Sequence, residues 1–516
     1  MAIQFKTVVR DVGRIVQVVS LMAFVSVPIA VVHGEYYAVP AFVISGLLML
    51  AIGVALARSF TDAPDPGKLH GMLIAATAWG VVGIFGALPF LVIAWTITLD
   101  PLPAWTNTPS INDTVAVFRQ PINGIFESMS GFTSTGLTMA TVEDDLPRSL
   151  HWWRSFTEWV GGVGVIVLTV AILARPGSGS LTLYESEARS KKIHPSIVST
   201  VREIWKIYFG FTIVAIALFL VVGMPVWGAV NHAMTAIATG GFSIHADSIG
   251  YYGEPLIEYA VIPVMIAGSI AFPIHYLILK GELRNFYADI QTRWVFVWFA
   301  AGSITLTAVL SLNGQYETVE ETFRTALFQF VSATSNTGFG TTTIGDGTER
   351  AWTAGATLFI CLGMLTGAAA GSTVGGLKLI RVITLVKGTV WQIRNVFSPD
   401  SAIRQLSLGK RTLGENQVQR EYTEAAVVLV LWIAFLIVGV AVLLWTLSPG
   451  YPVEYVIFDV MSAQSNVGLD AGITGSNMPE TAKVMLLFNM WIGRLEIIPI
   501  AVLIGAVFKS AGLYET

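Results

Sequence analysis

Charged residues and cysteine are what this sequence has least of. Only 12% of its 516 residues are charged, about half the fraction common in soluble proteins. The single cysteine, Cys361, excludes an intrachain disulfide. A net charge of −4 argues against nucleic acid as a partner. No ATP-binding motif occurs and the histidines lack metal-ligand spacing, so we expect neither an enzyme nor an organic cofactor.

Long apolar runs, in contrast, are abundant. The chain is 54% hydrophobic, and runs of about 20 residues, the length of a transmembrane helix, recur along it. The sequence therefore predicts an all-α integral membrane protein with about ten transmembrane helices. The candidates are Arg14–His33, Tyr37–Ala57, Gly71–Ile97, Trp152–Ala174, Ile204–Met224, Leu256–Leu279, Val295–Leu312, Trp352–Ala370, Ala425–Leu447 and Val484–Phe508.

Basic residues gather in alternate connections between these runs. They are frequent between Arg175 and Lys206, between Lys280 and Arg293, and between Lys378 and Arg420. By the positive-inside rule these connections are cytoplasmic, in a multi-pass protein of the cytoplasmic membrane. The other connections then face outward, and their acidic residues would form a vestibule that attracts cations. These residues are Glu143, Asp144, Asp145, Asp247, Glu254, Asp346 and Asp470.

A short motif ending in glycine occurs four times in the outward connections. The residues of the four motifs are Thr133, Ser134, Thr135 and Gly136; Ile237, Ala238, Thr239 and Gly240; Ser335, Asn336, Thr337 and Gly338; and Ser465, Asn466, Val467 and Gly468. With the final glycines aligned, a polar residue stands nine positions upstream in every copy, namely Glu127, Asn231, Gln329 and Asp459. Six positions upstream stand Ser130, Met234, Ser332 and Ser462. The match outside the motif indicates a true internal repeat.

The repeating unit is a span, a short half-helix, a loop and a second span, always in the same orientation. We divide the chain into an N-terminal helix pair (1–70) and four pore repeats (71–180, 200–280, 290–386 and 422–510). Half-helices such as Pro121–Gly131 and Tyr451–Ser465 are too short to cross a bilayer. Irregular backbone at membrane depth requires surrounding protein or water, which four re-entrant loops around one pore would provide. Four ordinary extracellular loops are the alternative.

The loop chemistry favours a monovalent cation. Backbone carbonyls can replace the water shell of such an ion, and glycine lets the backbone turn them toward an axis. None of the four motifs contains an acidic or basic residue. The absence of fixed charge argues for K⁺ as the bound ion, with Na⁺ as a further candidate. The candidate filter residues are Ser134, Thr135, Gly136, Ala238, Thr239, Gly240, Asn336, Thr337, Gly338, Asn466, Val467 and Gly468.

Two features inside the apolar runs suggest a gate. The stretch from Gly367 to Gly376 holds enough glycine to break a helix, although Gly371 and Gly375 also fit a helix-packing motif. Arg494 lies mid-span and should face a cavity or a partner rather than lipid; an ion pair with Glu158 is the simpler explanation. Glu158 is also four residues from Arg154 on one helix face. Lys378 and Arg381 fit snorkelling to the cytoplasmic boundary, or contact with a partner.

The motifs resemble the Trk/Ktr/HKT superfamily of potassium transporters, most closely its Trk-type uptake subunit. The resemblance rests on Ser128–Thr138, Thr239–Ser243, Trp153–Gly162, Gly371–Lys378, Ser465–Gly468 and Gly493–Glu496. It implies one filter glycine per repeat, at Gly136, Gly240, Gly338 and Gly468. It also implies an intramembrane gate loop with Gly367, Gly371, Ser372, Gly375 and Gly376, and Arg494 in the pore. A glycine rather than a serine at position 136 goes with K⁺.

The same resemblance implies partners. They are membrane lipid, a second copy in a homodimer, and a cytoplasmic nucleotide-binding regulatory subunit. Three other functions stay open on the sequence: a K⁺/Na⁺ or K⁺/H⁺ symporter of the same architecture, an inactive scaffold or sensor, and an intramembrane serine protease. The protease would use Ser130 on its re-entrant segment with His151 nearby.

Overall fold

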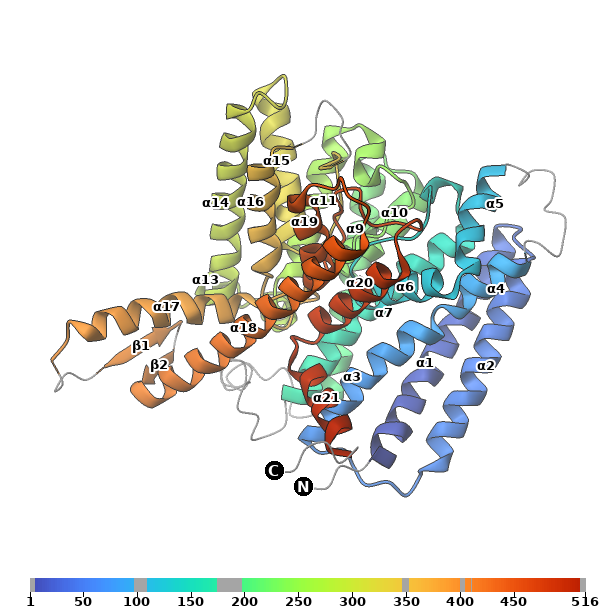
Figure 1. Ribbon diagram of the computed structural model, residues 1–516, viewed down its shortest axis with the longest axis horizontal. Helices are drawn as coiled ribbons and strands as arrows, with labels where there is room; N and C mark the ends of the chain where they lie inside the picture. The colour runs from blue at the N-terminus through green and yellow to red at the C-terminus, as the bar shows by residue number, and fades with distance from the viewer. Residues whose placement is uncertain are drawn as a thin grey trace.

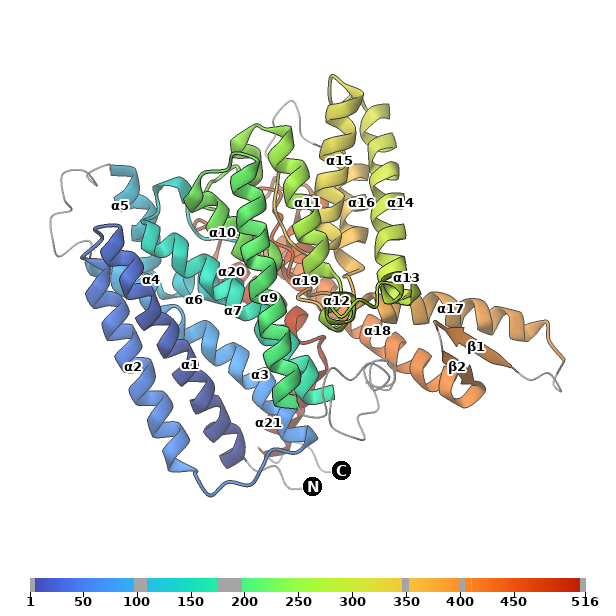
Figure 2. The ribbon, with the colours of Figure 1, turned by 180° about the vertical axis from the view of Figure 1, so that it is seen from behind.

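The computed structural model is almost entirely helical (Figure 1). It describes residues 5–96, 109–173, 197–345, 352–399, 404–409 and 411–510. An N-terminal pair, α1 (Phe5–Val32) and α2 (Ala38–Ser59), packs antiparallel along one flank (Figure 2). Gly13 and Gly53 let these two backbones approach closely, because a Cβ on either would meet the other helix within 3 Å.

The order of long helix, short helix, loop and helix then occurs four times. Repeat one has α3 (Lys68–Phe85), α4 (Leu88–Thr96), α5 (Pro109–Ala116), η1 (Val117–Arg119), α6 (Pro121–Phe132), η2 (Glu143–Asp145) and α7 (Arg148–Leu173). Repeat two has α9 (Ile197–Val221), α10 (Val226–Ile237), η4 (Ser248–Tyr252), α11 (Pro255–Ser269) and α12 (Phe272–Leu279). Repeat three has α13 (Arg284–Ala288), α14 (Ile290–Leu312), α15 (Val319–Thr334), α16 (Ala354–Leu365) and α17 (Leu379–Val396). Repeat four has α18 (Glu415–Thr446), α19 (Val453–Ser465), α20 (Glu480–Arg494) and α21 (Ile498–Ser510).

The second spans of repeats two, three and four are irregular, whereas α7 of repeat one is a continuous helix. Among the described residues six helices are long and apolar enough to cross a membrane, or eight if each bent pair counts as one span. The bent pairs are α11–α12, with a bend of 103°, and α20–α21, with a bend of 112°. Of the ten spans that the sequence predicts, the two that are not among these eight are α7 and the run that contains α16. In repeat three the apolar run contains only the 12-residue α16 before the chain leaves the helix.

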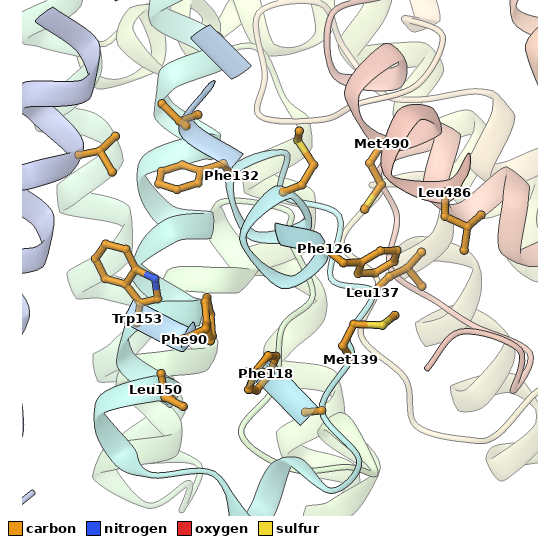
Figure 3. Close-up of a cluster of buried hydrophobic side chains, with 14 of the residues drawn as sticks. Phe90, Phe118, Phe126, Phe132, Leu137, Met139, Leu150, Trp153, Leu486 and Met490 are labelled. Carbon is orange, nitrogen blue, oxygen red and sulfur yellow. The ribbon is translucent and has the colours of Figure 1, made fainter. Parts of the chain in front are cut away.

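The half-helices predicted from the sequence are present. α6 ends one residue beyond its predicted boundary, and α19 begins at Val453. Proline at the first turn starts α6, where its missing N–H costs no hydrogen bond. The core around α6 draws side chains from repeat four as well as repeat one: Phe126 and Leu137 lie beside Leu486 and Met490 of α20 (Figure 3). The first and last repeats are therefore neighbours.

One element was not expected. A two-stranded antiparallel hairpin, β1 (Gln405–Leu408) and β2 (Arg411–Gly414), pairs Leu406 with Leu413. It packs between α17 and α18, and together they form an arm that projects from the helical body (Figure 1). Leu408 and Leu413 are both buried, so the hairpin has a small core of its own with the two helices. In the sequence this stretch belongs to the basic connection between Lys378 and Arg420.

Candidate functional site

The four short helices α6, α10, α15 and α19 end in loops of one backbone shape. In each loop one non-glycine residue adopts a left-handed conformation: Ser134 (φ 49°), Thr239 (φ 49°), Asn336 (φ 53°) and Asn466 (φ 57°). Two residues later stands a glycine with positive φ: Gly136 (93°), Gly241 (86°), Gly338 (79°) and Gly468 (99°). All eight positions require a conformation that costs most residues free energy, and such strain gathers at functional sites.

This shape corrects the alignment of repeat two by one residue. The glycine equivalent to Gly136 is Gly241, and Gly240 corresponds to Thr135. Both Thr135 and Gly240 donate their N–H to the carbonyl five residues upstream, at Ser130 and Thr235 respectively. The corrected alignment places His232 rather than Asn231 nine positions upstream, and Thr235 rather than Met234 six positions upstream. Every repeat then has a hydroxyl side chain at the second of these positions.

The four positive-φ glycines form a closed ring. A Cβ on Gly136 would collide with the carbonyl oxygen of Gly240, and one on Gly241 with that of Thr337. A Cβ on Gly338 would likewise meet the Val467 oxygen, and one on Gly468 the Thr135 oxygen. Each glycine therefore faces the carbonyl just before the glycine of the next repeat, and the fourth repeat returns to the first. Close approach, as well as positive φ, requires glycine at these positions.

Each loop is held on its outer side by the polar side chain nine residues upstream. Glu127 accepts the N–H of Met139 at 2.7 Å, and Asp459 accepts that of Ala471 at 2.7 Å. His232 Nε2 lies 2.9 Å from Ser243 Oγ, and Gln329 Nε2 donates to Thr342 O at 3.1 Å. All four side chains are fully buried. The sequence aligns Glu127, Gln329 and Asp459 but places Asn231 where the structure has His232, and the role of these side chains as anchors of the chain after each loop emerges only from these contacts.

A cavity of about 480 Å³ lies on the outer side of the ring. All four positive-φ glycines line it, as do the acidic residues Glu143, Asp247 and Asp470. Burial raises the pKa of Glu143 to about 7, against the opposing effect of the nearby Arg154 guanidinium. Asp346, which the sequence also places on this side, is outside the described residues. Of the acidic residues expected in a vestibule, three line this cavity, and Asp144, Asp145 and Glu254 are not part of its lining.

Arg154 pairs with a different carboxylate from the one its spacing suggested. Its Nε lies 2.7 Å from Glu127 Oε1, and both side chains are buried. Its Nη1 donates to Ser243 O of repeat two at 2.7 Å. Glu158 instead accepts the N–H of Phe242 at 3.2 Å, behind loop two. The i,i+4 expectation was wrong because the two side chains have other partners: Arg154 bonds Glu127 and Ser243 O, whereas Glu158 accepts from Phe242 N.

The predicted break in repeat three is present. α16 ends at Leu365 and α17 begins at Leu379, and the chain between them is non-helical and buried, apart from partial exposure at Thr366. We call residues 366–378 the inner loop. Gly371 (φ 85°) and Gly376 (φ 61°) have positive φ. A Cβ on Gly375 would stand 2.6 Å from Asn466 Oδ1, so this glycine is required for close packing of the inner loop beneath loop four.

Arg494, at the end of α20, connects the inner loop to loop one. Its Nη1 donates to Thr373 O at 2.8 Å, and its Nη2 donates to Ser134 Oγ and Gly161 O, each at 3.0 Å. Within the described residues it forms no ion pair, with Glu158 or with any other carboxylate. Its hydrogen-bond partners are neutral oxygens, and the Glu158 carboxylate interacts with the guanidinium electrostatically without forming a hydrogen bond to it.

Lys378 and Arg381 do not simply snorkel. Lys378 is 8% exposed and donates to Val374 O within the inner loop. Arg381 Nη2 lies 2.6 Å from Glu496 Oε2, at the bend between α20 and α21. Glu496 and Ile497 both have positive φ there, which is rare for a β-branched residue such as Ile497. The C-terminal end of the inner loop is thus fixed to the bend of repeat four.

A protease site has no support in the contacts. Ser130 Oγ accepts the N–H of Gly136 at 3.0 Å, and His151 Nε2 lies 2.8 Å from Glu143 O. The part of the chain that the structure describes contains no hydrogen bond between this serine and this histidine. Nor does that part hold a group of three or more His, Cys, Asp or Glu side chains suited to a metal.

Comparison with known proteins gives consistent matches along the chain. A family model described as TrkH, cation transport protein, matches residues 112–513. An uncharacterized cation transporter of Methanocaldococcus jannaschii is 31% identical, covering 98% of this chain and 97% of the relative. The Trk system potassium uptake protein TrkH of Escherichia coli is 29% identical, covering 98% and 99% respectively. The crystal structure of the potassium transporter TrkH from Vibrio parahaemolyticus superposes with a TM-score of 0.82 at 25% identity, covering 97% of this chain and 98% of that one.

Proposed function

The chain belongs to the TrkH family of cation transport proteins, and we propose that it takes up K⁺ across the cytoplasmic membrane through the ring of its four loops. The observation that carries this proposal is the closed ring of glycines, each facing a main-chain carbonyl of the next repeat. Relatives named as potassium uptake proteins match along nearly the whole chain. The transported ion is the substrate, and the chain requires no organic cofactor.

The filter consists of main-chain carbonyls contributed by Ser134–Gly136, Thr239–Gly241, Asn336–Gly338 and Asn466–Gly468. Carbonyl dipoles replace the hydration shell of K⁺ and carry no fixed negative charge. A filter with fixed negative charges would instead hold a divalent ion too tightly. The short helices direct the negative ends of their dipoles toward the ring, which further favours a cation. Ala238, which the sequence also places in the filter, is the C-cap residue that ends α10 just before this loop.

The gate is the inner loop, with Gly367, Gly371, Ser372, Gly375 and Gly376, together with Arg494. The inner loop obstructs the path beneath the ring, and the guanidinium opposes the entry of a cation. Outside the ring, the acidic vestibule raises the local cation concentration. A membrane potential that is negative inside supplies about 2.3 kcal/mol per charge per 100 mV for inward movement.

The assembly includes more than this chain. The protein works as a homodimer in the lipid of the cytoplasmic membrane, with the four loops on the extracellular side. A cytoplasmic nucleotide-binding subunit regulates it through the basic cytoplasmic surface. Basic connections at residues 175–192 and Lys410 lie outside the described residues.

The test is uptake of ⁸⁶Rb⁺ into proteoliposomes that contain the purified chain. We expect unlabelled K⁺ and Rb⁺ to inhibit ⁸⁶Rb⁺ uptake strongly and Na⁺ to inhibit it only weakly. Varying Na⁺ and pH separately distinguishes a channel-like path, whose flux is independent of both, from a K⁺/Na⁺ or K⁺/H⁺ symporter. Uptake that does not discriminate K⁺ from Na⁺ would overturn the filter assignment.

A further inference from the structure

The inner loop of repeat three packs against the broken second span of repeat two. The second span of repeat two is bent by 103° between α11 and α12. A helix that ends at Ser269 leaves its last carbonyls without intrahelical donors, and one that begins at Phe272 leaves its first N–H groups without acceptors. At membrane depth such groups need protein partners, because no water is at hand.

The inner loop supplies these partners. Thr373 N donates to Gly268 O at 3.3 Å, and Ala369 N donates to Ser269 O at 3.2 Å. In the other direction, Phe272 N donates to Gly371 O at 3.0 Å. Three main-chain hydrogen bonds thus take the place of those that the break in repeat two removes. The break and the inner loop satisfy each other, so they form one structural unit.

The Thr373 side chain adds further hydrogen bonds to this contact between the inner loop and repeat two. Its hydroxyl lies 3.0 Å from Gly268 O and 3.2 Å from Ile237 O, and it accepts a hydrogen bond from Thr239 Oγ1 at 3.0 Å. Both threonines are completely buried. Thr239 is the left-handed residue of loop two, so this pair of hydroxyls joins the inner loop directly to a loop of the glycine ring. Arg494 holds the other face of the same residue through Thr373 O.

We propose that the Thr239–Thr373 hydroxyl pair is a latch that holds the gate closed on repeat two. Thr373 is a positioning residue: it keeps the inner loop beneath the ring but does not itself contact the transported ion. To open, the inner loop leaves Gly268 and Thr239, and the orphaned groups of the break gain water from the opened path. The proposal rests on the proposed function, since it assumes that the inner loop is the gate.

The latch explains why these side chains are hydroxyls. Valine has nearly the same shape as threonine but leaves the Gly268 and Ile237 oxygens without a side-chain donor. A buried hydrogen bond contributes on the order of 1 kcal/mol, so its loss shifts a closed–open equilibrium roughly fivefold toward open. Serine keeps the hydroxyl and should keep the latch.

The experiment compares ⁸⁶Rb⁺ uptake by the full chain alone in proteoliposomes. We expect Thr373→Val and Thr239→Val each to raise uptake about fivefold. The double variant should show little increase beyond Thr373→Val alone, because Thr373→Val already removes the hydrogen bond that Thr239→Val breaks. Thr373→Ser should restore the low uptake. Thr384→Val is the matched control, because the Thr384 hydroxyl is also buried and bonds Ile380 O within α17 but touches neither loop.

Selectivity separates a latch from general damage. Thr373→Val should leave the preference for K⁺ over Na⁺ unchanged, because the ring glycines and their outer anchors are untouched. A structural collapse of the filter would lower this preference. If one variant does not fold, the other breaks the same bond and decides the question.

Two results would overturn the latch. The first is uptake unchanged in both valine variants while shortening of the inner loop raises it, which would leave the gate but remove the latch. The second is full additivity in the double variant. If the unaltered chain shows no K⁺-selective uptake at all, the proposed function itself fails, and the two failures are thereby distinguished.

Discussion

The outer and inner sides of the glycine ring are supported by different sets of contacts. On the outer side one buried side chain anchors each loop to its own repeat, namely Glu127, His232, Gln329 or Asp459, and Arg154 and Asp144 of repeat one also contact Ser243 O and Ala246 N of repeat two. On the inner side the left-handed residue of each loop contacts a different repeat. Ser134 accepts from Arg494, Thr239 donates to Thr373, Asn336 donates to Ser465 O, and Asn466 donates to Thr135 Oγ1.

The difference separates two tasks. Local anchors fix the shape of each loop independently, as a filter with constant geometry requires. Contacts between repeats make the inner side sensitive to the relative position of the repeats, as a gate requires. The account therefore predicts that outer-side changes alter selectivity and stability, whereas inner-side changes alter flux.

The largest effect is expected from the charge on the inner side. Arg494→Gln should raise ⁸⁶Rb⁺ uptake by roughly tenfold or more, since repulsion between unit charges a few ångströms apart is worth a few kcal/mol. Uptake into proteoliposomes measures this, with Arg420→Gln as the control because Arg420 lies exposed on α18, where it pairs with Glu424 far along the chain from the loops. Reduced uptake would mean that Arg494 supports the path rather than obstructing it.

The ring itself should respond in selectivity rather than flux. Gly136→Ser introduces a Cβ against the Gly240 carbonyl and strains a φ of 93°. We expect the preference for K⁺ over Na⁺ to fall by roughly tenfold, equivalent to about 1.4 kcal/mol. Gly475→Ser is the control, because a Cβ there meets open space. Competition by Na⁺ against ⁸⁶Rb⁺ uptake is the measurement, and unchanged competition would contradict the ring.

An outer anchor should affect both selectivity and stability. The Asp459 carboxylate accepts from Ala471 N, Thr474 N and Thr474 Oγ1 at 2.7 to 3.0 Å. Asp459→Asn turns one acceptor into a donor facing these groups, which costs about 1–3 kcal/mol. Thermal unfolding in detergent should shift to lower temperature, with a few-fold loss of K⁺ preference. Asp62→Asn on an exposed turn serves as the control; equal unfolding temperatures would refute the anchoring role.

The smallest effect is expected from the vestibule. Because the pKa of Glu143 is raised to about 7, its carboxylate is mostly neutral at pH 6 and mostly charged at pH 8. The apparent affinity for Rb⁺ at low ionic strength should therefore increase about twofold between these values, and added salt should screen the effect. Glu143→Gln should abolish the increase, whereas Asp145→Asn, outside the cavity lining, should preserve it. If the pH dependence persists in Glu143→Gln, a group other than Glu143 causes it.

The sequence predicts the fold class, the four loops and the break at Gly367–Gly376 because each has a local signal. Apolar length marks the spans, and glycine marks the loops and the break. Repeat two was misaligned by one residue because Gly240 and Gly241 are adjacent, and composition does not say which has positive φ. The hydroxyl at Thr235, six residues before Gly241, is the signal that decides it.

What the sequence did not reveal depends on contacts between distant segments. Arg154 has Glu158 four residues away, yet pairs with Glu127, which is 27 residues away. Thr373 belongs to the predicted gate stretch, but only its contact with Thr239, 134 residues away, singles it out. The hairpin at residues 405–414 is short and polar on its outer face, so its two buried leucines carry too little signal.

The central claim is that four main-chain carbonyl groups surround a dehydrated K⁺ at the ring. Anomalous diffraction from crystals of the protein grown with Rb⁺ tests it most directly. The account predicts a peak on the axis, surrounded by the carbonyl oxygens of Thr135, Gly240, Thr337 and Val467. Rb⁺ found only in the acidic vestibule, with no peak at these oxygens, would contradict it.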